Sequence, residues 1–170
     1  MEFNTVIKNR YSVRSFTGER VKKETLEKIL NAGHLAPTGC NFQPQRIYVM
    51  NTPEAIEKLR ECTHSHFGAP TALLVCYNRD ECWTRKHDGA LSGPIDASIV
   101  TTHMLLAAEN EGIGCTWIMN FDPYKMKEVF NIPENIIPVA LLVMGYASED
   151  AMPHPYHSRF RDMEETVKYI

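Results

Sequence analysis

Apolar residues follow two different periods along this chain. In residues 21–37 they recur at helical spacing, with Leu26, Ile29 and Leu30 on one face, which predicts an amphipathic helix. Residues 71–77 and 137–146 are instead almost continuously apolar, as strands buried on both faces are. Helical and strand segments are mixed along the sequence, so we expect a layered fold in which a sheet lies between helices.

Capping residues indicate where the helices begin. Asn4 is expected to cap a short first helix, and Asp96 a long helix that ends near Asn110. Thr52 and Asp122 each precede a proline, a combination that is typical of helix starts. The remaining expected elements are strands at 46–50 and 115–119, a short helix within 163–170, and a polar loop at 78–94.

Size and composition narrow the class of protein. A length of 170 residues and a hydrophobic content of 44% suit one domain, which we expect to cover residues 1–170. The net charge of -3 gives no reason to expect a nucleic-acid partner. The 5 cysteines form no CxxC pair, which argues against a zinc knuckle or a disulfide framework. Without a signal peptide or a membrane-spanning stretch, a cytoplasmic location away from the membrane is expected.

The stretch KNRYSVRSFTG places Arg10, Ser12 and Arg14 at every second position. In an extended backbone these side chains share one face, and Tyr11 and Val13 lie on the other. Such a pattern is often only a solvated edge. Two guanidinium groups and a hydroxyl also match the oxygens of a phosphate, whose dianion needs about two compensating charges. A phosphate site is therefore the functional alternative.

Three further motifs carry weaker signals. The stretch APTGCNFQPQ contains the amide side chains of Asn41 and Gln43, which can read the edge of a flat heterocycle. The glycines of 112–114 form a turn but no dinucleotide-binding fingerprint. Arg159 and Arg161 form a basic pair in the tail, a pair that is usually solvated.

Taken in order, these motifs resemble those of the FMN-dependent nitroreductase family, in its short branch with a single domain. The resemblance spans nearly the whole chain and includes the stretches APTGCNFQP and LLAAENEGIGCTWI. It implies a three-layer α+β fold, with a central, mainly antiparallel sheet flanked by helices, in an intertwined homodimer. The single residues that match the family pattern are Arg10, Ser12, Arg14, Asp96, Gly145, Tyr146, Arg159 and Arg161.

The resemblance also implies FMN as the cofactor, bound between two subunits. Arg10 would lie near the N1/C2 edge of the flavin, and the backbone N–H of Met119 near N5, which makes these two the implied catalytic residues. The loop 37–43 would cover the cofactor from the other subunit, and no metal is expected. The implied cofactor-binding residues are Arg10, Tyr11, Ser12, Arg14, Pro37, Thr38, Gly39, Asn41, Gln43, Trp117, Ile118, Met119, Asn120, Arg159 and Arg161.

The implied reaction is a ping-pong transfer of a hydride from NAD(P)H to the flavin, and then to a small oxidised acceptor such as a nitroaromatic or a quinone. Arg10 would stabilise the charge of the reduced flavin. The chain departs from the family pattern at Gln45, where Trp is frequent, and at Met119 and Asn120. It also lacks the helical insertion that walls the pocket in larger members. The loop 78–94 is then either a pocket wall or a mobile surface segment.

Other functions fit parts of the sequence. A metal-dependent hydrolase would use His64 and His66, the pair at 87–88, or His154 and His157, although none has the spacing of a known metal motif. An FMN-binding sensor would hold the cofactor without turnover. A narrow flavin reductase or a reductive dehalogenase would use the same fold.

Overall fold

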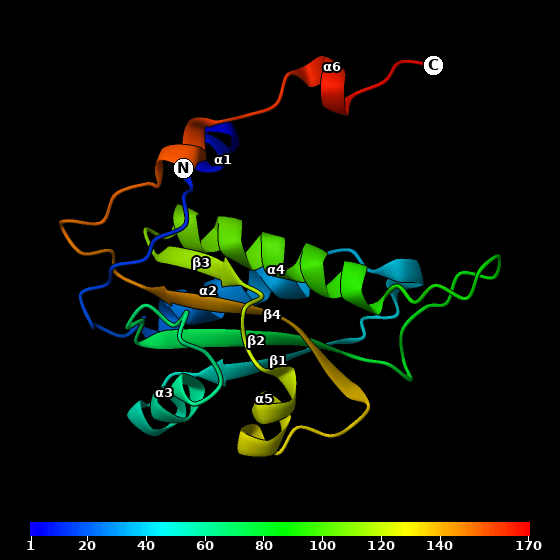
Figure 1. The fold of residues 1–170 in the computed structure, drawn as a ribbon, viewed down its shortest axis with the longest axis horizontal. Helices are drawn as coiled ribbons and strands as arrows, with labels where there is room; N and C mark the ends of the chain where they lie inside the picture. Colours follow the sequence, from blue (N-terminus) through cyan, green and yellow to red (C-terminus); the bar gives the residue numbers. More distant parts are fainter.

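An antiparallel sheet of four strands forms the centre of the fold, in the order β1-β2-β4-β3. The computed structural model describes all of residues 1–170. Helices α2 and α4 cover one face of the sheet, and α3 and α5 cover the other (Figure 1). The expected three-layer α+β fold with an antiparallel sheet is therefore confirmed. The strands are β1 (Gln45–Met50), β2 (Thr71–Asn78), β3 (Gly114–Ile118) and β4 (Ile136–Gly145).

The helices lie in the segments where the sequence pattern predicts them. They are α1 (Phe3–Asn9), α2 (Lys23–His34), α3 (Pro53–Arg60), α4 (Gly93–Asn110), α5 (Pro123–Phe130) and α6 (Met163–Thr166). Short 3-10 turns occur at Gly39–Asn41 and Pro155–Ser158. No helix combines the length and the apolar character that a membrane crossing would require.

Two predicted helix starts are wrong. Helix α1 begins after Glu2, whose carboxylate accepts a hydrogen bond from a first-turn amide at 3.3 Å, so Asn4 lies inside the helix. Helix α4 begins after Ser92, so Asp96 lies in its first turn rather than at its cap. The reason is Pro94, whose fixed φ favours the first turn of a helix and starts α4 early. The caps predicted at Thr52 and Asp122 are confirmed.

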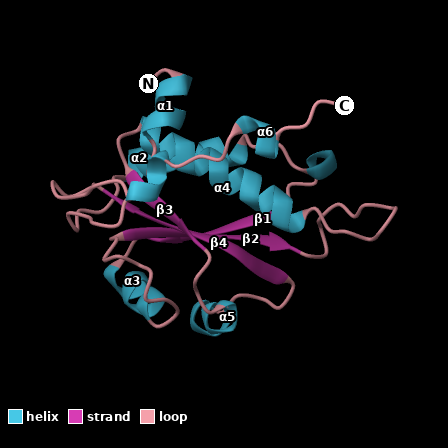
Figure 2. Ribbon diagram, turned by 45° about the horizontal axis from the view of Figure 1, so that its top comes forward, coloured by secondary structure: helices cyan, strands magenta, loops and turns pink.

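The two middle strands, β2 and β4, are covered on both faces (Figure 2). Along β2, Leu73 and Val75 belong to the core beneath α2 and α4, whereas Leu74 and Cys76 belong to the core beneath α3 and α5. Every residue of β2 is buried, which explains its unbroken apolar run.

The edges of the sheet differ from its middle. Strand β1 pairs with β2 on one side only, and its Arg46 forms an exposed ion pair with Glu81. At the other edge, β3 is joined by the segment that follows α1, through a bridge between Ser12 and Cys115.

Both ends of the chain lie on the α4 side of the sheet, and the C-terminal segment extends away from the body (Figure 1). Its large apolar side chains have little cover within the chain: Tyr156 is 66% exposed and Phe160 86% exposed. Phe3 in α1 and Ile95 in α4 are similarly open, at 64% and 63%. Exposed apolar side chains therefore occur on α1, on α4 and on the tail.

The first prediction concerns Gly93, which fixes how closely α4 approaches the sheet. A Cβ added there would lie 2.1 Å from Cδ2 of the buried Tyr77 ring. We expect Gly93→Ala to lower the free energy of unfolding by about 1–3 kcal/mol, measured by urea denaturation, because a packed ring has no room to move. Gly33→Ala is the control, since its Cβ meets Cγ of Met104 at 2.7 Å, in an unbranched side chain that can adjust its torsions more easily than a ring. Equal losses in the two variants would contradict this explanation.

Candidate functional site

The extended segment 10–14 is held against the start of β3 by its own backbone. The amide of Val13 donates to the carbonyl of Cys115 at 3.2 Å, and the hydroxyl of Thr116 donates to the carbonyl of Val13. The Val13 side chain is 2% exposed and packs directly on Gly114, where a Cβ would lie 2.8 Å from Val13 Cγ2. With Val13 fixed inward, the neighbouring Ser12 and Arg14 point away from the core.

Arg10, Ser12 and Arg14 line a single cavity of about 540 Å³, as the alternation along the sequence predicts. Tyr11 lines the same cavity, although strict alternation would place it on the opposite face. Its hydroxyl donates to the carbonyl of Ala151 at 3.3 Å, which turns the ring toward the C-terminal tail.

The C-terminal tail supplies the other side of this cavity. Arg159 lies there, with its Cζ 4.9 Å from the ring centre of Tyr156. The rings of Tyr11 and His157 are edge to face, with their centres 6.3 Å apart. The two ends of the polypeptide therefore meet at one site, which we call the arginine cavity. The tail residues that line it are His154, Tyr156, His157, Arg159 and Phe160.

Only Arg159 among these tail residues was singled out from the sequence as a cofactor ligand. His154 and His157 were considered as metal ligands, but no group of three or more His, Cys, Asp or Glu side chains is placed to hold a metal ion. Tyr156 and Phe160 were missed, because the tail carries no periodic pattern. The available signal was the mixture of aromatic and basic residues in HPYHSRF.

The charges of the arginine cavity are not neutralised by ion pairs. Arg10, Arg14 and Arg159 form none of the salt bridges of the chain. Arg14 donates to the carbonyl of Ser12 at 3.3 Å, and its Cζ lies 5.8 Å from the ring centre of Phe67. Three guanidinium groups that lack carboxylate partners form a site suited to an anion.

Two titratable groups lie next to Arg10. Burial raises the pKa of Glu109, and the nearby charge of Arg10 opposes that shift. Burial also raises the pKa of the Cys115 thiol to about 12, so this thiol is neutral and adds no negative charge. The charge of Arg10 thus acts on the carboxyl group of Glu109, which does not line the cavity.

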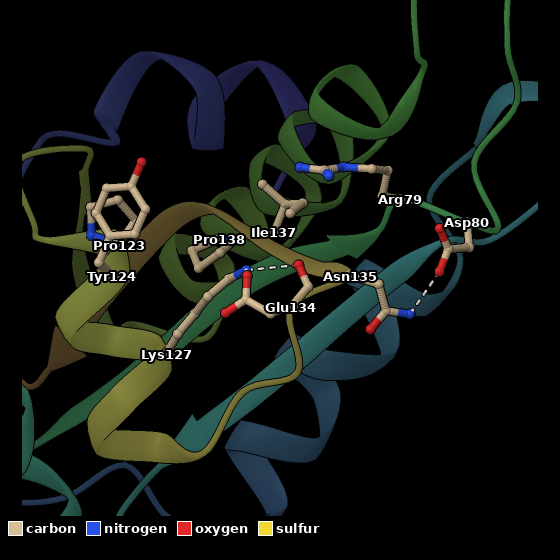
Figure 3. A pocket seen from close by; sticks show the side chains of 9 residues that line it. All are labelled: Arg79, Asp80, Pro123, Tyr124, Lys127, Glu134, Asn135, Ile137 and Pro138. Carbon is tan, nitrogen blue, oxygen red and sulfur yellow. Dashed lines mark hydrogen bonds and ion pairs between the residues drawn. The ribbon is translucent and has the colours of Figure 1, made fainter.

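A second cavity, of about 500 Å³, lies between α5 and the start of β4 (Figure 3). Here Lys127 Nζ donates to the Glu134 carbonyl at 2.8 Å, and Asn135 Nδ2 donates to Asp80 Oδ2 at 3.0 Å. Its two basic residues, Arg79 and Lys127, are matched by two acidic ones, Asp80 and Glu134. The arginine cavity is lined by three arginines and no acidic residue, so it is the better anion site.

The structure does not bring Arg161 to the arginine cavity. This residue, which precedes α6, instead forms an exposed ion pair with Glu165 of α6 at 2.9 Å. Of the two tail arginines expected to contact the cofactor phosphate, only Arg159 lines the arginine cavity, and its contact with a phosphate stays a prediction.

The end of β3 lies near Arg14 through the loop 62–68. Phe67 of this loop contacts Arg14, and its Ser65 accepts a hydrogen bond from Asn120 Nδ2 at 3.3 Å. Met119 is 71% exposed and follows the last residue of β3 that pairs with β4. The preceding Trp117 is half-buried, and the Ile118 side chain is buried in the core, so only the backbone of Ile118 is available to a ligand.

The loop 37–43 lies at the opposite end of α4 (Figure 1). The amide of Gly39 donates to Asp96 in the first turn of α4 at 2.8 Å. Arg10 acts on Glu109, in the last turn of the same helix. Thirteen helical residues separate Asp96 from Glu109, a distance of about 20 Å. Within one chain, the predicted ligands Pro37, Thr38, Gly39, Asn41 and Gln43 are therefore remote from the arginine cavity.

Comparisons with known proteins show the family to which this chain belongs. A sequence profile of the nitroreductase family matches residues 7–70 and 64–146. The crystal structure of a nitroreductase family protein from Clostridium difficile 630 has 40% identity and a TM-score of 0.93, over 99% of this chain and 98% of that chain.

Two curated relatives carry functional names. A Methanothermobacter thermautotrophicus protein, provisionally named NADH dehydrogenase/NAD(P)H nitroreductase, is 30% identical over 88% of this chain and 80% of its own length. A Bacillus subtilis protein named FMN reductase [NAD(P)H] is 28% identical over 89% of this chain and 70% of its own length. The match of the family profile to most of the sequence, together with the likeness in structure, means that the chain belongs to the nitroreductase family.

Proposed function

We propose that this chain is an FMN-dependent oxidoreductase that takes a hydride from NAD(P)H and passes electrons to a small oxidised acceptor. One observation carries the proposal: three arginines without carboxylate partners, from both ends of the chain, line one cavity. Membership of the nitroreductase family supplies the reaction class. The name of the Bacillus subtilis relative supports FMN and NAD(P)H as ligands.

The residues of the arginine cavity fit a flavin mononucleotide. Arg14, Arg159 and the Ser12 hydroxyl offer charged and neutral donors to the phosphate dianion. The rings of Tyr11 and Tyr156 offer apolar surface beside them. A cavity of about 540 Å³ is also within the usual size range of ligand sites.

When bound, FMN supplies the hydride chemistry. Arg10 would hold a fixed positive charge at the pyrimidine edge, where negative charge develops on reduction, and would favour the reduced state. The N–H of Met119 lies beyond the paired part of β3 and would donate a hydrogen bond toward the reacting edge. Neither role requires a general base from the protein.

We further propose that residues 1–170 form one domain and that two copies form a homodimer with FMN at the interface. About 20 Å of α4 separates the loop 37–43 from the arginine cavity, so a second copy has to supply this loop if both are to contact one cofactor. The exposed apolar side chains of α1, α4 and the tail are groups that a partner would cover. The partners are then NAD(P)H, the acceptor and a second copy of the chain.

The second prediction tests the arginine cavity as the FMN site. Arg10→Ala combined with Arg14→Ala should weaken FMN binding by about 10²–10⁴-fold, because each charge-assisted contact is worth roughly 1.5–3 kcal/mol. The measurement is a titration followed by quenching of flavin fluorescence. Arg20→Ala with Arg79→Ala is the matched control, since it removes two exposed arginines that do not line the arginine cavity. Full flavin occupancy in the Arg10/Arg14 variant would refute the assignment of the arginine cavity as the FMN site.

The third prediction concerns the reaction itself. The purified protein should absorb near ~450 nm, as bound flavins do, and anaerobic addition of NADH or NADPH should bleach this band. A quinone added afterwards should restore the band, because electrons leave through the acceptor. Bound flavin that neither nucleotide reduces would indicate a flavin-binding protein without this activity.

The fourth prediction concerns the tail. A chain that ends at His154 loses Tyr156, Arg159 and Phe160, and we expect it to lose flavin and to dissociate into monomers. A chain that ends at Asp162 keeps all of these residues and serves as the control. Flavin absorbance and light scattering report the two properties. A chain ending at His154 that stays yellow and dimeric would remove the tail from the proposed site.

A further inference from the structure

Asp96 is a buried acidic residue that forms no ion pair. Its side chain is 2% exposed and lies in the first turn of α4. Oδ1 accepts a hydrogen bond from the Gly39 amide at 2.8 Å, and Oδ2 accepts one from the Ser92 hydroxyl at 2.7 Å. The free N–H groups at the start of the 18-residue helix favour a negative charge at this position. Burying a carboxylate costs free energy unless it is hydrogen-bonded, so these two hydrogen bonds are needed to keep Asp96 in the core.

The bonds of Asp96 connect the start of α4 to the distant loop 37–43 and to Ser92, the residue that directly precedes the helix. Through Gly39 it holds the loop 37–43, and through Ser92 it holds the end of the segment 79–92. A Cβ added at Gly39 would lie 3.1 Å from Ser92 Oγ and 3.3 Å from Trp83 Cβ, so the two segments are packed tightly against each other. They therefore behave as one unit anchored at the start of α4.

The segment 79–92 is built on a hairpin, whose paired residues lie within 83–92, and is not an irregular loop. Thr84 bridges Leu91, and the Ser92 amide donates to the Trp83 carbonyl at 2.8 Å. Its outer part extends beyond the body of the molecule, on the same side as the loop 37–43 (Figure 1). Because Trp83 and Ser92 form the base that Asp96 anchors, the direction of the hairpin depends on this carboxylate.

The loop 37–43 also needs external support. Cys40, Asn41 and Gln43 have left-handed φ angles of 49°, 58° and 51°. Such angles are disfavoured for residues with a side chain and persist only where neighbouring structure enforces them. The bond from Gly39 to Asp96 lies directly beside this strained stretch, so it is one of the contacts that enforce it.

We propose that Asp96 is a positioning residue for the flavin reaction: it holds the loop 37–43 over the flavin bound to the second copy of the chain, and it directs the hairpin 79–92 to form the outer wall of the acceptor pocket. The inference rests on the proposed function, because it takes the loop to contact the partner's flavin. Because the hairpin is packed against the loop 37–43, it would lie beside the same flavin. The hairpin therefore limits which acceptors reach the flavin.

The test compares Asp96→Ala with Asp96→Asn, which keeps an oxygen for the Gly39 amide and can donate to Ser92. Thr52→Ala is the matched control, since it removes a helix-start hydrogen bond from α3 on the far face of the sheet. For Asp96→Ala we expect faster hydrogen exchange in 38–43 and 83–92 but not in α3 or α5. We also expect at least tenfold weaker FMN binding, and a rise in the KM of the acceptor that exceeds the fall in kcat. Asp96→Asn should restore most of each property.

The exchange measurement is made on the flavin-free protein, so it does not depend on the proposed function. If the wild-type chain binds no FMN, the proposed function fails. Hydrogen exchange still tests whether Asp96 anchors the loop 37–43 and the hairpin. If Asp96→Ala exchanges as the wild type does, or exchanges faster with unchanged FMN and acceptor constants, the positioning role is overturned. If Asp96→Ala does not fold, Ser92→Ala, which removes one of the two bonds, is held to the same criteria.

A second variant tests the hairpin alone. Residues 85–90 are replaced by an Asn-Gly turn that closes the pair of Thr84 and Leu91. FMN binding should change less than twofold, because the base of the hairpin remains. The value of kcat/KM should rise at least tenfold for a bulky quinone and stay constant for a small one. An unchanged ratio between the two quinones would overturn the assignment of the hairpin as a wall.

Discussion

The contact between Val13 and Gly114 holds the candidate site together. Because position 114 has no side chain, Val13 reaches the core, and its backbone bonds to Cys115 and Thr116. This contact sets the register of the whole segment 10–14, and a shift of one residue would turn its arginines toward the core. The tail then docks on Tyr11, so the placement of Arg159 also depends on how this short segment lies against β3.

Much of the fold could be predicted because the signals were local. The run of β2 and the cap at Thr52 depend on neighbouring residues only. The cap at Asp96 was mispredicted because Pro94 provides a stronger helix start, which freed the Asp96 carboxylate to bind a distant loop. The alternation at 10–14 is local as well, and it correctly indicated three of the residues that line the arginine cavity.

The rest of the site could not be predicted in this way, because it depends on contacts between distant parts of the chain. Nothing near His157 in the sequence shows that its ring meets the ring of Tyr11, since that contact joins the two ends of the polypeptide. Arg161 continues the pattern of Arg159, but Glu165 lies one helical turn away and pairs with it. Spacing alone does not distinguish an arginine that is free to bind a ligand from one that a neighbour neutralises.

The open side of β1 has a consequence for how the protein behaves in concentrated solution. An edge strand exposes unpaired backbone groups on which another molecule can add a strand, the first step toward aggregation. Arg46 places a charge on this strand, and its exposed ion pair with Glu81 keeps a polar group at the rim. Charged side chains on edge strands oppose such addition, so the salt bridge, which contributes little to folding, helps to keep the sheet from growing.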